Sequence, residues 1–164
     1  MRRLLIVGYG DIGKRFAARY AAQFSLTAVC RTKINDSSSS MRSVNWLNAD
    51  LDTPQTLRRL AGLSDDVVYL APPNPNGPSD KRVRNFLGSI SSGVRIPQRF
   101  VYMSTTGVYG DCAGEFVCET RMAKPQTDRA RRRLDAESQV RAWSKKTGCL
   151  SVVLRVPGIY ASDR

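Results

Sequence analysis

Short apolar runs alternate along the chain with segments in which apolar residues recur at helical spacing. The first run, Leu4 to Val7, is apolar at every position and is followed at once by glycine. This pattern is typical of a strand that is buried on both faces of a parallel sheet. Five further runs predict strands at residues 26–30, 44–47, 66–70, 99–104 and 150–155.

The segments between these runs carry the signals of helices. Ile12, Phe16, Tyr20 and Phe24 recur at every fourth position, which predicts a helix over residues 11–24 with an apolar stripe against the sheet. Capping residues and spacing predict further helices beginning at Thr53-Pro54 and spanning residues 79–91 and 127–146, the last with Gly148 as its C-cap.

Strands that alternate with helices indicate an α/β fold, a doubly wound parallel sheet of the Rossmann type with strand order 3-2-1-4-5-6. The 164 residues suffice for one domain with a sizeable core, so residues 1–164 are predicted to form a single domain. The proline-rich segment 71–80 is interpreted as the loop after the fourth strand, and the serine-rich segment 33–43 as a surface loop.

A glycine pattern follows the first predicted strand and opens the first predicted helix. It fits G-x-G-x-x-G, in which the glycines permit a tight turn, close approach of a pyrophosphate and close packing of helix on sheet. The amides at the helix start then attract phosphate. We therefore predict a dinucleotide site in the turn formed by Gly8, Tyr9, Gly10, Asp11, Ile12 and Gly13.

The end of the second predicted strand bears on which dinucleotide is bound. NAD-preferring sites usually place Asp or Glu there, on the ribose hydroxyls. This chain has Arg31 and Lys33 and no carboxylate in that stretch. Arg31 could pair with a 2′-phosphate through two hydrogen bonds, so NADP(H) is favoured over NAD(H).

Composition excludes several classes of chemistry. The chain has no histidine, which rules out Ser-His-Asp triads and His-ligated metals within it. No cysteine pair has C-x-x-C spacing, so reduced thiols are expected, with a disulfide between Cys112 and Cys118 as a less favoured alternative to free Cys30, Cys112, Cys118 and Cys149. No metal site is predicted.

The net charge of +12 could attract a polyanion. However, no nucleic-acid-binding motif accompanies it, and the aromatic residues have core spacing, so nucleic acid is a disfavoured partner. No apolar run approaches the roughly 18 residues of a membrane span, and the first is too short for a secretory signal. We expect a cytoplasmic protein that does not enter the membrane, with a homodimer left open.

The stretch YMSTTGVYGD at residues 102–111 resembles the extended short-chain dehydrogenase/reductases, the NAD(P)-dependent epimerase/dehydratases. Their fifth strand ends in a Ser/Thr-rich run followed by V-Y-G. The glycine turn, Asp50 after the third strand and LRVPGIY at residues 154–160 agree with the same family in order and spacing. The chain is similar to it over nearly its whole length.

The resemblance implies a role for each matching position. Asp50 would hydrogen-bond adenine, and Thr105 would be the catalytic hydroxyl that orients a small-molecule substrate. The remaining positions would line the inner ribose and the nicotinamide, namely Ala71, Pro72, Pro157 and Gly158.

The sequence departs from the family in its acid/base pair. The family has Y-x-x-x-K on the helix after the fifth strand, and here Arg129 and Arg133 occupy the two positions. Arginine stays protonated near neutral pH and cannot act as a general base, although Arg129 could clamp an anion or a developing oxyanion. Tyr109 is the alternative acid, and Arg131 and Arg132 are predicted to form a solvated face.

Two functions remain open from the sequence. The first is an NADP(H)-dependent oxidoreductase or sugar-nucleotide epimerase/dehydratase-like protein with altered catalysis. The second is a non-catalytic NAD(P)-binding redox sensor or interaction module. Members of the family continue beyond the sixth strand into a substrate domain, so this chain is expected to hold the cofactor-binding part alone, without that domain.

Overall fold

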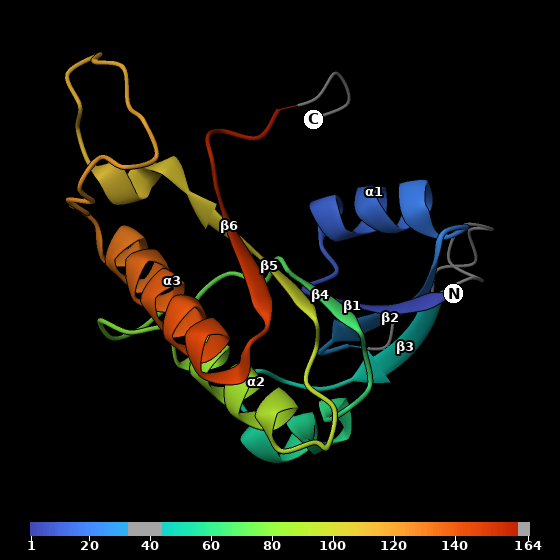
Figure 1. The fold of residues 1–164 in the computed structure, drawn as a ribbon. Helices are drawn as coiled ribbons and strands as arrows, with labels where there is room; N and C mark the ends of the chain where they lie inside the picture. Colours follow the sequence, from blue (N-terminus) through green and yellow to red (C-terminus); the bar gives the residue numbers. More distant parts are fainter. Residues whose placement is uncertain (33–43, 161–164) are drawn as a thin grey trace.

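A six-stranded parallel sheet forms the centre of the computed structural model, which describes residues 1–32 and 44–160. Neighbouring strands follow the order β3-β2-β1-β4-β5-β6 (Figure 1). The predicted fold class and strand order are therefore confirmed. The strands are β1 (Arg2–Val7), β2 (Phe24–Cys30), β3 (Val44–Asn48), β4 (Asp66–Tyr69), β5 (Arg99–Thr105) and β6 (Leu150–Val156).

The central strand β1 is buried from Leu4 to Val7. Leu5, Ile6 and Val7 are fully buried because β2 and β4 pair with β1 on its two sides while apolar side chains cover both faces. Burial of each such side chain contributes roughly 1.5–3 kcal/mol. The strand that precedes the glycine turn is thus fixed in position by the core.

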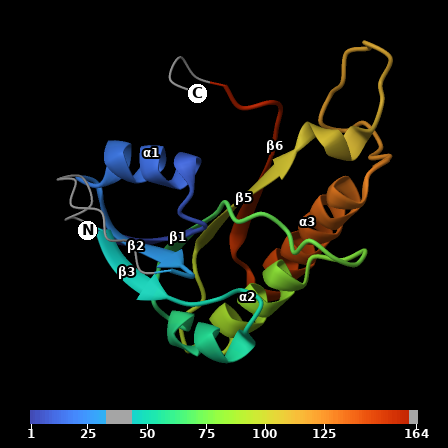
Figure 2. The same ribbon diagram turned by 180° about the vertical axis from the view of Figure 1, so that it is seen from behind.

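Helices cover the two faces of the sheet unequally (Figures 1 and 2). On one face lies α1 (Asp11–Tyr20), and on the other lie η2 (Pro54–Leu60), α2 (Lys81–Ser91) and α3 (Asp128–Thr147). A short helix, η3 (Thr106–Tyr109), continues directly from β5. The larger of the two apolar clusters joins the sheet to α2 and α3.

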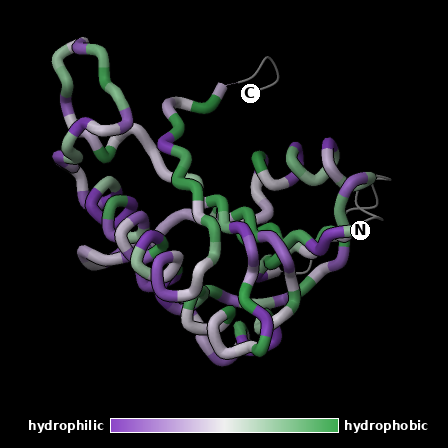
Figure 3. The backbone as a smooth tube through the Cα atoms, viewed as in Figure 1, coloured by the Kyte–Doolittle hydropathy of each residue, from purple (hydrophilic) through white to green (hydrophobic). Residues whose placement is uncertain are grey.

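The uneven cover leaves apolar side chains of the edge strand exposed. Leu150, Val152 and Leu154 alternate along β6 and point away from the core. Figure 3 shows the resulting hydrophobic colour along this strand. Within residues 1–32 and 44–160, no helix is long and apolar enough to cross a membrane.

The first helix is shorter than the sequence pattern predicts. It ends at Tyr20, and Phe24 instead begins β2, where it pairs with Arg2 in the parallel register. The backbone groups of this segment form hydrogen bonds with β1 and not within a longer helix. The spacing of Phe24, four residues after Tyr20, is therefore coincidental. The aromatic stripe is half-buried: Phe16 packs against the smaller apolar cluster and contacts the ring of Tyr20.

The caps of the other helices agree with the sequence in part. Thr127 caps α3 through a hydrogen bond from Ala130 N, and Gly148 ends it with φ of 77°. Thr53 makes no side-chain cap. The helix predicted over residues 79–91 begins two residues later, at Lys81, and Asp80 caps it by accepting from Arg82 N and Val83 N. The predicted loop at residues 33–43 lies outside the described residues.

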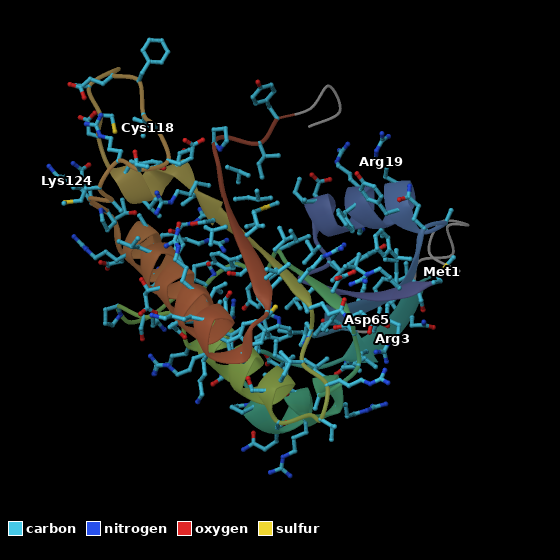
Figure 4. The ribbon with its side chains drawn as sticks, in the orientation of Figure 1. Met1, Arg3, Arg19, Asp65, Cys118 and Lys124 are labelled. Carbon is cyan, nitrogen blue, oxygen red and sulfur yellow. The ribbon has the colours of Figure 1, made fainter. Side chains whose placement is uncertain are left out.

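Ion pairs join the start of β1 to the start of β4. Arg3 and Asp65 lie side by side in Figure 4 and are joined by a 2.7 Å contact, and Arg2 makes a two-point contact with Asp66. The two arginines at the start of the chain are therefore partners of the segment that begins β4. Their charge is partly neutralised within the fold.

Candidate functional site

The glycine turn packs too closely for side chains at two positions. Gly8 has φ of 96°, and a Cβ there would lie 2.6 Å from the backbone nitrogen of Ala71. A Cβ on Gly13 would lie 2.7 Å from the carbonyl oxygen of Gly8. Both glycines are therefore required for the contact between β1, α1 and the end of β4.

Gly10 has a different surrounding. A Cβ on it would meet no atom within 4 Å, so packing does not explain the glycine. It is the N-cap of α1 and offers no side chain to cap the first-turn amides. An uncapped helix start beside open space fits the approach of a phosphate group.

A cavity of about 320 Å³ opens beside this turn. We call it the glycine-turn cavity. Its lining brings together most of the residues predicted to bind a dinucleotide from the ends of four neighbouring strands: Val7, Gly8, Tyr9, Val29, Cys30, Arg31, Thr32, Ala49, Asp50, Leu51, Ala71, Pro72 and Arg82. Carboxyl ends of parallel strands where the strand order reverses are the usual ligand site of such sheets.

The walls of the glycine-turn cavity are held by α2. Arg82 makes a two-point ion pair with Asp52 at 2.6 and 2.8 Å and donates to the carbonyl oxygens of Pro72 and Pro73. Asn85 donates to the carbonyl oxygen of Leu51. Sequence reasoning missed Arg82, because nothing in its local pattern distinguishes it from an exposed helical arginine.

Arg31 lies at the rim of the same cavity. Its side chain is exposed and makes no hydrogen bond to any described residue, while its carbonyl oxygen accepts from Asn48. Hydrogen bonds from Arg82, and more weakly the charges of Arg82 and Arg31, hold the pKa of Asp52 below its ordinary value. The guanidinium is therefore near the cavity and available to a ligand.

A second cavity, of about 420 Å³, lies where β5, η3, α3 and β6 meet. We call it the α3 cavity. Four of the predicted site residues, Thr105, Arg129, Arg133 and Pro157, are brought together here although 52 positions separate the first from the last. Its full lining is Met103, Ser104, Thr105, Thr106, Gly107, Thr127, Arg129, Ala130, Arg133, Val156, Pro157, Gly158 and Ile159.

Arg129 and Arg133 share one face of α3 but differ in their contacts. Arg129 is exposed and makes no hydrogen bond or ion pair with any described residue. Arg133 is buried, and its Nη1 donates to Tyr102 Oη at 3.0 Å and to the carbonyl oxygens of Met103 and Ala71. Arg133 is thus a fixed link between α3 and the ends of β4 and β5.

The prediction that Arg131 and Arg132 form a solvated face of the helix is wrong for Arg132. Arg132 is buried, with 8% of its surface exposed, and donates to the carbonyl oxygen of Gly77 in the proline-rich loop. Only Arg131 fits the prediction, being exposed and paired with Asp128. The helix packs against the loop after β4 on this side, a contact that local sequence does not reveal.

Glu137 forms a buried polar network that supports the α3 cavity. It accepts from Ser104 at 2.6 Å and from Arg155 at 2.7 Å, and Arg141 adds a weaker contact. Burial alone would raise the pKa of Glu137, but the bonds from Arg155 and Ser104 lower it below its ordinary value. The network ties α3 to β5 and β6, which carry the cavity walls.

The two tyrosines near this site are buried. Tyr109 lies beneath Arg155, whose guanidinium is 4.7 Å from the ring centre, and it is not among the residues lining the α3 cavity. Burial raises the pKa of Tyr102 to about 12, although Arg133 opposes the shift. Neither geometry offers a phenol directly to the cavity.

The sequence matches the NAD dependent epimerase/dehydratase family over residues 4–163. The chain belongs to this family. The resemblance found at the glycine turn, at residues 102–111 and at residues 154–160 is therefore confirmed, and dependence on a nicotinamide dinucleotide is the property of the family.

Solved structures of similar fold span more than this chain. An epimerase candidate from Burkholderia cenocepacia J2315 is 25% identical, with a TM-score of 0.82 over 99% of this chain and 57% of its own. UDP-glucuronic acid 4-epimerase from Bacillus cereus, solved with NAD, is 17% identical, with a TM-score of 0.79 over 96% of this chain and 57% of its own. The chain thus spans under two thirds of the length of these epimerase/dehydratase structures. No curated protein matches it in sequence.

The structure also shows the state of the four cysteines. All four cysteines are free thiols, so the alternative disulfide between Cys112 and Cys118 is not formed. Cys118 projects with Lys124 on the long segment between η3 and α3 (Figure 4). In the described part of the chain, no cluster of metal-ligating side chains is found.

Proposed function

We propose that this chain binds NADP(H) in the glycine-turn cavity and serves an oxidoreductase or epimerase reaction at the α3 cavity. The observation that carries the proposal is Gly10, which no packing requires and which leaves the start of α1 open for a pyrophosphate. Family membership supports the dinucleotide, and the exposed Arg31 supports the 2′-phosphate.

Each end of the cofactor would have its own set of residues. Asp50 and Leu51 would hold the adenine, and the first-turn amides of α1 the pyrophosphate. Ala71 and Pro72 would line the ribose between the two cavities. A bound nicotinamide supplies hydride transfer, and Pro157 would border it.

The α3 cavity would orient a substrate but not exchange its proton through arginine. Thr105 Oγ1 already accepts from Gly107 N at 3.2 Å, which leaves its own hydrogen free to donate to a substrate oxygen. Arg129 would stabilise negative charge on that oxygen. Arg155 covers the ring of Tyr109. Tyr109 would therefore act as the acid only after a movement of the segment around η3.

A non-catalytic nucleotide sensor is the second candidate. It is favoured by Arg133, whose three hydrogen bonds give it a structural task in place of proton exchange. Two results would support a catalysed reaction: loss of NADPH absorbance on adding a carbonyl substrate, or conversion of a sugar-nucleotide to its epimer, followed by chromatography of the product. Saturable nucleotide binding with neither result across a broad panel of substrates would support the sensor.

Replacing Arg31 tests the preference for NADP(H). Arg31→Ala is expected to lower NADPH affinity about tenfold, because a charge-assisted hydrogen bond contributes about 1.5–3 kcal/mol and exposure reduces it. NADH affinity should stay within about twofold of that of the unchanged protein, a difference of about 0.4 kcal/mol. Fluorescence titration of both nucleotides measures the two effects.

Arg59→Ala provides the matched control. Arg59 is an exposed arginine of η2 that lines neither cavity, so its loss changes the net charge equally. Both affinities should be unaltered in this variant. An equal fall in NADPH and NADH affinity on replacing Arg31 would reject the 2′-phosphate contact.

A further inference from the structure

The α3 cavity is positively charged. Arg129 and Arg133 both line it, and none of its lining residues within the described chain is acidic. Asp128, the nearest carboxylate in sequence to Arg129, is paired with Arg131 instead, at 2.6 Å. The cavity therefore has two cations and no acidic residue in its described lining, although the charge of Arg133 also interacts with buried Asp80 behind it.

The two guanidinium groups have unused donors. Arg129 makes no hydrogen bond or ion pair with any described residue. All the bonds of Arg133 to described residues come from Nη1, so Nη2 and Nε donate to none of them. Planar donor pairs of this kind match the oxygens of a carboxylate or a phosphate.

Hydroxyl groups surround these donors. Thr105, Thr106 and Thr127 also line the cavity, and each can donate a hydrogen bond to an oxygen. Arg133 is held rigidly, so it can meet an anion without first losing side-chain freedom. Arg129, one helical turn away, can close on the same group from the open side.

We propose that the α3 cavity binds the anionic group of its substrate, a carboxylate or a phosphate, between Arg129, Arg133 and the threonine hydroxyls. The inference rests on the proposed function, which places the substrate in this cavity. It names the substrate class as anionic. The same charges that exclude a general base at position 129 become the means of recognising the ligand.

The test is calorimetric titration of the whole chain with D-glucuronate, D-glucose and inorganic phosphate. The two sugars differ by a carboxylate in place of a hydroxymethyl group. Glucuronate should bind, and glucose should bind at least about tenfold more weakly. Binding of phosphate but not glucuronate would support the proposal with phosphate as the anion. Binding of neither anion, or equal binding of the two sugars, would overturn it.

Variants separate the cavity from the general positive charge of the protein. Arg129→Gln should lower the affinity for the anion about tenfold. Arg129→Lys should lower it less, because lysine keeps the charge but lacks the planar pair of donors. Arg131→Gln, an exposed arginine of α3 outside the cavity, should have no effect. An equal loss in the Gln variants at 129 and 131 would show nonspecific attraction and contradict the proposal.

NADPH titration of the same samples keeps the two proposals apart. Saturable NADPH binding without anion binding would leave the proposed function standing and reject the anionic substrate class. Absence of NADPH binding would reject the proposed function itself. Because Arg131 lines neither cavity, Arg131→Gln should leave NADPH affinity within about twofold, or about 0.4 kcal/mol.

Discussion

Glu137→Ala is expected to destabilise the protein by about 3–5 kcal/mol, the usual cost of removing one partner of a buried ion pair. Glu137 is fully buried, and the change leaves Arg155 and Ser104 without their acceptor. Unfolding by urea, followed by circular dichroism, measures the free energy of unfolding. The loss should also loosen the α3 cavity, since the three segments joined at Glu137 form its walls.

Arg141→Ala is the matched control for this network. Arg141 contacts the same carboxylate, but its side chain is 52% exposed, so its removal should cost under about 1 kcal/mol. Similar losses in the two variants would contradict the assignment of Arg155 and Ser104 as the principal partners of Glu137.

The same carboxylate predicts a pH dependence. The pKa of Glu137 is lowered in the folded protein. Its contribution to the free energy of unfolding is therefore fully present above the unfolded pKa of about 4.3 and is lost as pH falls through the folded pKa. The difference in unfolding free energy between the unchanged protein and Glu137→Gln should therefore shrink below about pH 4. A constant difference between pH 7 and pH 3 would argue against an ionised Glu137.

Gly10→Ala is expected to lower NADPH affinity at least about tenfold, or about 1.4 kcal/mol, with little loss of stability. A methyl group there meets no protein atom, and Gly10 has extended backbone angles that alanine adopts freely. The stability cost should stay near 1 kcal/mol, as for an altered N-cap. The methyl group would, however, occupy the space in which the pyrophosphate approaches the helix start.

Gly8→Ala is the contrasting variant. Its φ of 96° and the 2.6 Å approach to Ala71 require the backbone to shift, so this change should destabilise the fold by more than about 2 kcal/mol. Thermal unfolding and NADPH titration of both variants separate the two roles. Equal destabilisation by the two changes, or undiminished NADPH affinity in Gly10→Ala, would contradict the distinction.

The sheet could be predicted from the sequence because its signals are local. The apolar run before Gly8 and the alternation of strands with helices follow from burial and turn chemistry within a few residues. The end of α1 could not, because the strand pairing of Phe24 with Arg2 joins residues far apart in sequence. Tertiary pairing overrode the helical spacing there.

The candidate site was predictable to a similar degree. The positions of Gly10, Arg31 and Arg129 follow from motifs and their spacing. The structure places Arg31 and Arg129 in the linings of the two cavities and Gly10 at the N-cap of α1. The burial of Arg132 and the Arg82–Asp52 ion pair depend on loops packed from other parts of the chain. No pattern in their immediate neighbours distinguishes these arginines from solvated ones.

Fluorescence titration of the unchanged protein with NADPH and NADH tests the central claim most directly. Saturable binding of one NADPH per chain, tighter than that of NADH by about tenfold or about 1.4 kcal/mol, is the result that the glycine turn and Arg31 predict. Failure of both nucleotides to bind at millimolar concentration would contradict the assignment of the glycine-turn cavity as a dinucleotide site.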